Sequence, residues 1–239
     1  MSEIWNKGLF IKHFATNLDD GIEIDVRIVV LCAILCAVVA YLIGSINFSV
    51  IISKTYGADV REKGSGNAGT TNMFRVYGKK AGICTFLADI LKTVIVLVLG
   101  RLILGLLGAY VAGLFCIIGH AYPLFFKFKG GKGVVCMATM ILMTAPLVFL
   151  IMFVIFFIIL FGFKMVSLAS VMCALIYPLI LSNMAHFEGF FAINILIAML
   201  CSVLVIFLHR KNIVRIFNHE ESKISIGRKK GGNDEKRQK

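Results

Sequence analysis

Long runs of apolar residues recur along most of this chain, and they restrict its fold more than any other feature. Spanning the hydrocarbon layer of a membrane as a helix takes about 20 apolar residues. Of the 239 residues, 59% are hydrophobic and only 16% are charged, whereas a soluble domain is closer to half apolar and a quarter charged. Because no long polar linker divides the chain, we expect one all-α integral membrane domain.

Six apolar stretches have the composition of membrane segments. The stretch at residues 133–163 is long for one helix and short for two. Pro146 lies near its middle and predicts two short helices, because proline cannot continue the backbone hydrogen-bond ladder. The other five fit one helix each, at residues 26–53, 82–99, 106–126, 165–184 and 189–208.

The placement of Lys and Arg also favours two helices in residues 133–163. Short cytoplasmic loops carry an excess of basic residues. Residues 54–80 contain six, residues 127–132 contain three, and the tail from Arg210 onward contains ten, whereas the connections between them contain almost none. All three basic segments lie on one side only if residues 133–163 cross twice. The sequence therefore predicts about seven transmembrane helices, with the N-terminus outside and the C-terminus cytoplasmic.

The ends of the chain differ from the membrane domain, which we place at residues 26–221. Residues 1–25 form an extension that lacks the basic start and apolar core of a signal peptide. They are either a short helix on the membrane surface or a disordered tail. Residues 222–239 are polar and rich in Gly and Lys, which predicts a disordered, basic cytoplasmic tail.

The net charge of +12 does not indicate nucleic acid, because the basic residues punctuate apolar spans. It indicates membrane topology or anionic substrates instead. The seven cysteines form no CxxC pair and no cluster with zinc-ligand spacing. We therefore expect buried apolar thiols and no metal site.

Three polar segments carry the candidate chemistry, and the first reads GSGNAGTTNMFR, from Gly64 to Arg75. Its glycines let backbone N–H groups approach an anion closely. Arg75 supplies a planar fork suited to a phosphate. The alternative is a flexible loop, although flexibility alone does not require two asparagines and an arginine so close together. The other candidates here are Ser65, Gly66, Asn67, Gly69, Thr71 and Asn72.

The second segment reads GHAYPLFFKFKGGKGV, from Gly119 to Val134. It is not a Walker A loop, because glycine follows its last lysine. If a helix begins after the paired glycines, its free N–H groups and positive dipole end face the same anion as the lysines. The alternative is that the lysines only follow the positive-inside rule. The candidates are His120, Lys129, Gly130, Gly131, Lys132 and Gly133.

The third segment reads HRKNIVRIFNHEE, from His209 to Glu221. On a helix that continues the last span, His209 and Asn212 share a face. The alternative is an amphipathic helix that lies on anionic lipid.

Two charged residues, Asp89 and Lys92, lie three positions apart within the second predicted span. Charges at that depth are costly unless they are paired or near water. We therefore expect an internal ion pair, either as a structural element or as a support for the site.

Together the three segments resemble the motifs of the bacterial acyl-phosphate:glycerol-3-phosphate acyltransferases, the PlsY family. The similarity runs from about residue 26 to 221 and includes YLIGSINFS, DVRE and VSLAS outside the three motifs. Three residues depart from the family's pattern. Asn47 stands where proline is usual, Thr70 where alanine is usual, and Asn218 where glycine is usual, although asparagine also tolerates a left-handed conformation.

The resemblance implies a reaction in phospholipid synthesis. Acyl-phosphate donates its acyl group to the 1-hydroxyl of glycerol 3-phosphate, which gives lysophosphatidate and inorganic phosphate. Acyl-phosphate is already activated, so we expect no cofactor and no metal. We further expect a monomer in the bacterial plasma membrane, with the site facing the cytoplasm.

The resemblance also implies a role for each candidate. Ser65, Arg75 and Lys132 would hold the phosphate of glycerol 3-phosphate. The glycine backbones of the first two segments, with Asn67, Thr71 and Asn72, would cradle the acyl-phosphate head. His209 and Asn212 would orient the attacking hydroxyl. The general base stays open between His209, His120 and a phosphate oxygen of a substrate.

A transporter of phosphorylated solutes is the rival hypothesis. It predicts weak pseudo-symmetry between two halves and a site near the middle of the bilayer. The sequence shows no such repeat, and its motifs cluster at one predicted face.

Overall fold

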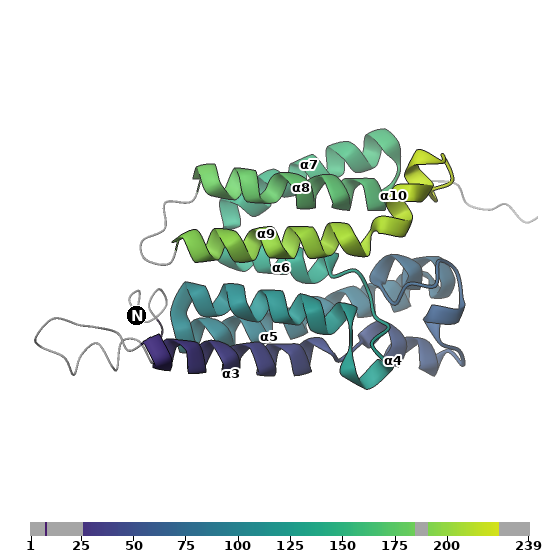
Figure 1. Ribbon diagram of the computed structural model, residues 1–239. Coiled ribbons are helices and arrows are strands. Elements are labelled where there is room, and N and C mark those ends of the chain that lie inside the picture. The colour runs from purple at the N-terminus through teal and green to yellow at the C-terminus, as the bar shows by residue number, and fades with distance from the viewer. Residues whose placement is uncertain (1–7, 9–25, 185–190, 225–239) are drawn as a thin grey trace, which may run out of the picture.

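The computed structural model describes residue 8, residues 26–184 and residues 191–224, and all regular structure in these ranges is helical. The expectations for the N-terminal extension and for the tail beyond residue 224 fall outside the described residues. Figure 1 shows the long helices side by side. The helices are α3 (Val26–Gly44), α4 (Phe48–Thr55), α5 (Thr70–Ala121), α6 (Val134–Thr144), α7 (Pro146–Phe163), α8 (Val166–Met184), α9 (Phe191–Leu208) and α10 (Arg210–Phe217), with 3-10 turns η1 (Val60–Glu62) and η2 (Leu124–Phe126).

The segment labelled α5 is a hairpin and not one straight helix. Its backbone leaves the helical region at Gly78, and again at Leu104 and Gly105. Beyond Gly105 the chain runs back along itself: a Cβ built on Gly100 would lie 2.3 Å from the carbonyl oxygen of Gly108. Glycines at such a crossing let two helix backbones touch. The predicted spans at residues 82–99 and 106–126 are therefore the two arms of this hairpin.

The first predicted span, residues 26–53, is broken in the structure. Helix α3 ends at Gly44 and α4 begins at Phe48. The side chain of Asn47 caps α4 by accepting a hydrogen bond from the N–H of Val50. Asparagine is among the best N-capping residues. Asn47 therefore starts a new helix at the position where the family usually has proline.

The stretch at residues 133–163 forms two helices, which confirms the prediction from Pro146. Helix α6 ends at Thr144, and Pro146 is the first residue of α7. Proline suits that position because its missing N–H would have no helical partner there.

Arg101, near the α5 reversal, donates to the carbonyl of Met143 at the end of α6. Lys164, just after α7, accepts from Ile224 at the other end of the bundle.

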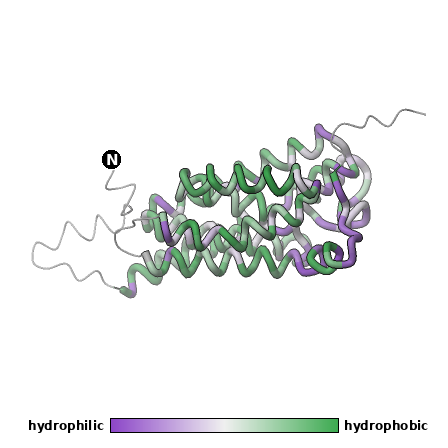
Figure 2. The backbone as a smooth tube through the Cα atoms, turned by 90° about the horizontal axis from the view of Figure 1, so that it is seen from above, coloured by the Kyte–Doolittle hydropathy of each residue, from purple (hydrophilic) through white to green (hydrophobic). Residues whose placement is uncertain are grey.

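The polar connections gather at one end of the bundle, which we call the loop end: residues 45–69, 122–133 and 209–224. Tyr41 donates to the carbonyl of Tyr122 there. Figure 2 shows hydrophobic residues along the length of the bundle and hydrophilic stretches chiefly at this end. A small apolar cluster packs under the first glycine segment, apart from the main core between α5, α6, α8 and α9; it consists of Val50, Val60, Ala68, Met73 and Ala81.

The outer faces of the helices are apolar, as expected of a membrane protein. Helix α7 is apolar all round and buries only three of its side chains, which is typical of a helix in lipid. Within the described residues, four helices are long and apolar enough to span a membrane, or five if the bent pair α9–α10 counts as one. One of the four is the stretch Thr70–Phe126, which contains the α5 reversal.

Candidate active site

The first glycine segment is a loop that leads into α5 at the loop end. Its glycines Gly64 and Gly66 have positive φ, where a side chain would strain the backbone. Gly69 precedes α5 without a side-chain cap. Uncapped N–H groups at a helix N-terminus attract anions. Ser65 and Arg75 are exposed beside this terminus.

The structure gives Asn72 a different role from the expected one. Its side chain is buried, and its oxygen accepts from the N–H of Ser65 at 3.0 Å. Its amide nitrogen donates to the carbonyls of Val60 and Lys63. Both amide hydrogens are used within the loop. Asn72 therefore shapes the loop, and we no longer assign it to a substrate.

The second glycine segment folds back onto the end of α5. The N–H groups of Gly130 and Gly131 donate to the carbonyls of Ala121 and His120, at 3.0 and 3.1 Å. A Cβ on Gly130 would lie 2.0 Å from the carbonyl oxygen of His120. Only glycine fits so close an approach. Helix α6 begins right after Gly133, so a helix does follow the paired glycines.

Arg61 joins the first two loops, a role that no local signal in the sequence indicates. Its guanidinium donates to the carbonyls of Phe126 and Lys129, at 2.8 and 3.1 Å. It also pairs with Asp59 at 2.7 Å. The hydrogen bond from Arg61 lowers the pKa of Asp59. The DVRE segment contributes only to the family resemblance, because nothing local shows that its arginine contacts residues 65 positions further along the chain.

The third segment bends where the sequence predicted a continuing helix. Helix α10 is turned by 57° from α9. Its first turn still brings Asn212 next to His209, because the N–H of Asn212 donates to the carbonyl of His209. At the end of α10, Asn218 has φ −82°, and the next residue, His219, is the one with a left-handed backbone (φ 58°).

Lys132 and Asn212 connect the second and third segments. The ammonium of Lys132 donates to the side-chain oxygen of Asn212. The amide nitrogen of Asn212 donates to Glu221 at 2.8 Å. Glu221 also accepts from Ser167 of α8 and from Arg215, both at 2.9 Å. Side chains that are 80 residues apart in the chain therefore meet in one network.

The network is positively charged. Burial lowers the pKa of Lys132 to about 8; Glu221 opposes this shift, whereas Arg215 and Arg75 add to it. Burial disfavours the charged form of Glu221, but hydrogen bonds from Arg215, Asn212 and Ser167 outweigh it and lower the pKa of that carboxyl. Arg75 and Arg215 therefore both act on Lys132, and only one carboxylate, Glu221, opposes these three cations, which leaves a field suited to an added anion.

His209 lies just beyond the end of α9 and is buried. Its Nδ1 is 2.8 Å from the carbonyl oxygen of Val205 and therefore carries the proton. Burial, followed by the charge of Lys132, lowers the pKa of His209 to about 4. At neutral pH the ring is uncharged, and its Nε2 is a hydrogen-bond acceptor. A hydroxyl group is a suitable donor to that nitrogen.

The candidate residues differ in their access to solvent. Ser65, Gly66, Thr71, Arg75 and Lys129 are exposed; Asn67, Gly69, Gly130 and Lys132 are partly buried; Asn72, His120, Gly131, Gly133, His209 and Asn212 are buried. His120 has its Nδ1 3.0 Å from the ammonium of Lys92. Among the described residues, no group of three or more His, Cys, Asp or Glu side chains has the arrangement to hold a metal ion.

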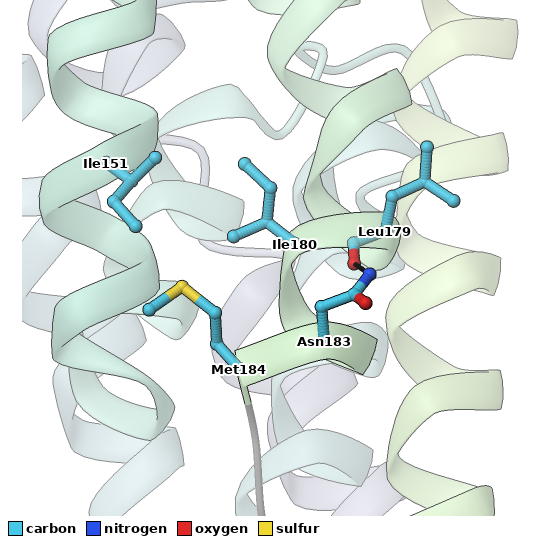
Figure 3. Close-up of a pocket in the computed structure, with 5 residues that line it drawn as sticks. All are labelled: Ile151, Leu179, Ile180, Asn183 and Met184. Carbon is cyan, nitrogen blue, oxygen red and sulfur yellow. Dashed lines mark hydrogen bonds between the residues drawn. The ribbon is translucent and has the colours of Figure 1, made fainter.

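An apolar pocket of about 340 Å³ lies between α7 and α8, away from this network (Figure 3). It is lined by Ile151, Leu179, Ile180, Asn183 and Met184. The amide of Asn183 donates to the carbonyl of Leu179 on its own helix. None of the five side chains is titratable, so the pocket offers no acid, base or nucleophile.

Comparisons with known proteins show the family to which the chain is similar. The family model for glycerol-3-phosphate acyltransferases matches residues 34–219. The glycerol-3-phosphate acyltransferase of Finegoldia magna is 42% identical over 190 residues, which are 78% of this chain and 93% of the relative. The one of Bacillus subtilis (strain 168) is 42% identical over 186 residues, which are 77% of this chain and 94% of the relative.

Two solved structures have the same fold. Both are crystal structures of PlsY (YgiH), an integral membrane glycerol 3-phosphate acyltransferase. The glycerol 3-phosphate form has a TM-score of 0.75 and 34% identity, and the match covers 81% of this chain and 96% of that chain. The lysophosphatidic acid form has a TM-score of 0.73 and 34% identity, over 81% and 95% of the two chains. The chain therefore belongs to the glycerol-3-phosphate acyltransferase family, the PlsY family.

Proposed function

We propose that this enzyme transfers an acyl group from acyl-phosphate to the 1-hydroxyl of glycerol 3-phosphate. The hydroxyl oxygen attacks the acyl carbon, and the bond from that carbon to the bridging oxygen breaks. The products are lysophosphatidate and inorganic phosphate, and the hydroxyl proton ends on the phosphate. Acyl-phosphate carries its own leaving group, so the step requires no cofactor and no metal.

The observation that carries the proposal is the Lys132–Asn212 contact with its surrounding charges. Lys132, Arg75 and Arg215 outnumber the one carboxylate of Glu221, which favours substrates that bring phosphate. We assign Ser65, Arg75 and Lys132 to the phosphate of glycerol 3-phosphate. The glycine backbones of the two loops, with Asn67 and Thr71, hold the acyl-phosphate head. Preorganised donors of this kind stabilise charge that develops on the leaving phosphate.

His209 orients the attacking hydroxyl through its neutral Nε2. With a pKa of about 4, the imidazole is a weak base, so a phosphate oxygen is the better final proton acceptor. Asn212 holds Lys132 in place beside it. Positioning of the two substrates then supplies much of the rate.

We also propose the topology that the charges predict. The two arms of α5 and the helices α3, α6, α7, α8 and α9 give seven passes. The N-terminus is outside, and the loop end faces the cytoplasm of a bacterial cell. A site at one membrane face suits a donor with an apolar chain and a charged head. It also counts against a transporter, whose site lies near the middle of the bilayer.

The test is an assay of purified protein with radiolabelled glycerol 3-phosphate. Acyl-phosphate, acyl-CoA and acyl-carrier protein serve as parallel donors, each with and without a chelator. We expect labelled lysophosphatidate from acyl-phosphate alone, at the same rate with the chelator. Equal use of acyl-CoA, or loss of activity with the chelator, would refute the proposal.

A further inference from the structure

Three titratable side chains lie buried beneath the second glycine loop, and the chemistry proposed above does not use them. The side chains are Asp89, Lys92 and His120, which are 1%, 3% and 4% exposed. The ammonium of Lys92 lies 2.9 Å from Oδ1 of Asp89 and 3.0 Å from Nδ1 of His120. The ion pair expected from the sequence is therefore present, and a histidine of the second segment joins it.

Lys92 also connects this cluster to the end of α3 through hydrogen bonds. Its ammonium donates to the carbonyls of Gly44 and Ile46, at 3.2 and 2.9 Å. Gly44 is the last residue of α3 and Ile46 lies two residues beyond it, where the helix dipole favours a cation. The three hydrogens of the ammonium meet three acceptors, and the carboxylate of Asp89 pairs with its charge. Its position is therefore fixed from several sides.

The cluster fixes the orientation of His120. Because an ammonium can only donate, Nδ1 of His120 accepts, and the ring proton is on Nε2. The Nε2 side of the ring faces Gly131: a Cβ built there would lie 2.2 Å from Nε2. The same Cβ would lie 2.8 Å from the carbonyl oxygen of Ala68, in the first loop. Gly131 is thus confined between His120 and the first loop.

We propose that Asp89, Lys92 and His120 are positioning residues that set the place of the second glycine loop against the first. Asp89 and Lys92 hold the imidazole of His120 in place. The imidazole and the carbonyl of Ala68 then restrict where the backbone of Gly131 can lie. Lys132 follows Gly131 directly, so this contact also places its ammonium. His120 is then a support for the phosphate site and not the general base. This inference rests on the proposed phosphate site.

A double-mutant cycle between His120 and Gly131 tests the proposal. Glycerol 3-phosphate binding is followed by thermal shift, and kinetics with acyl-phosphate are measured on the same samples. We expect His120→Ala and Gly131→Ala each to raise the apparent KM for glycerol 3-phosphate by at least about fivefold. The double variant should be no worse than the worse single one, because the added methyl group then meets no imidazole.

Conservative variants separate positioning from folding. His120→Asn keeps an acceptor near Lys92 but loses the ring beside Gly131, and Asp89→Asn keeps the shape of the carboxylate without its charge. We expect both to fold and to raise KM with kcat less affected. The matched control is Thr85→Val, because Thr85 is buried on the same arm of α5 and donates only to the carbonyl of Ala81 on its own helix.

The outcomes are distinct. Effects of His120→Ala and Gly131→Ala that multiply, or an unchanged KM in folded His120→Asn and Asp89→Asn, would overturn the positioning role. If all four variants are recovered only as unfolded protein, the cluster is required for folding, and this result also overturns the positioning role. A wild-type protein that binds glycerol 3-phosphate but makes no product would instead refute the proposed reaction and leave the binding cycle to decide this inference.

Discussion

The apparent affinity for glycerol 3-phosphate should fall as pH rises, because the ammonium of Lys132 loses its proton within an accessible range. Burial places its pKa near 8, well below the value of about 10.4 for a free lysine. With that pKa, about nine-tenths of the Lys132 side chains are charged at pH 7 and about one-tenth at pH 9. If only the charged form binds phosphate, the apparent KM rises about tenfold over that interval.

Other groups near Lys132 do not produce the same change. His209, with a pKa of about 4, is neutral throughout. The pKa of Glu221 is lowered, so its carboxylate stays charged. The guanidinium groups of Arg75 and Arg215 also stay charged. The substrate keeps its second phosphate charge, because a phosphate monoester has a second pKa of about 6.

The assay is steady-state kinetics with varied glycerol 3-phosphate at several pH values from 7 to 9, at saturating acyl-phosphate. Lys132→Arg is the matched control, because arginine keeps its charge over this range. Its KM can differ from wild type at every pH, but we expect it not to rise with pH. A flat KM in wild type, or the same rise in Lys132→Arg, would refute the assignment of Lys132 to the phosphate.

Three further predictions concern residues at the loop end. Arg75→Lys should fold but raise the KM for glycerol 3-phosphate by at least about tenfold, because lysine lacks the two-nitrogen fork and a charge-assisted contact is worth about 1.5–3 kcal/mol. Lys80→Ala is the control. Wild-type kinetics for Arg75→Lys would exclude two-nitrogen binding of the phosphate by Arg75. Arg61→Met should lower the melting temperature and should lower kcat/KM about tenfold, because the first two loops lose their shared donor. Arg210→Met is the control and should stay near wild type, because the guanidinium of Arg210 donates to Phe207 at the junction of α9 and α10. Equal losses in both variants would contradict the role of Arg61 in joining the loops. Single cysteines at Lys63, Lys127 and Asn218, all exposed, should label only from the cytoplasmic side in a cysteine-free protein; labelling of one of them from outside would separate the loops and refute the topology.

The helices were largely predictable, because lengths of apolar runs and one proline are local signals. Pro146 marked the break between α6 and α7 correctly. The break after Gly44 was missed, because Asn47 caps a new helix within a stretch that reads as one apolar run. The bend at His209 was missed too, since α10 continues in sequence without a glycine or proline.

The site was predictable in its residue types but not in its connections. The glycines and lysines of the second segment predict an anion site through local chemistry, and that site stays a proposal. The roles of Asn72, Arg61 and Glu221 depend on partners far along the chain or on loop shape. A single sequence holds no local signal for such contacts. His120 shows the same limit, because only the fold places it beside Lys92 and Asp89.

The fate of one oxygen atom distinguishes acyl transfer from phosphoryl transfer. Acyl-phosphate labelled with ¹⁸O at the bridging position is incubated with glycerol 3-phosphate and the purified enzyme, and the products are analysed by mass spectrometry. Acyl transfer breaks the bond between the acyl carbon and that oxygen. We therefore expect the label to leave in inorganic phosphate, with one lysophosphatidate formed for each phosphate. Label retained in free fatty acid, together with phosphoryl transfer to glycerol 3-phosphate, would contradict this expectation.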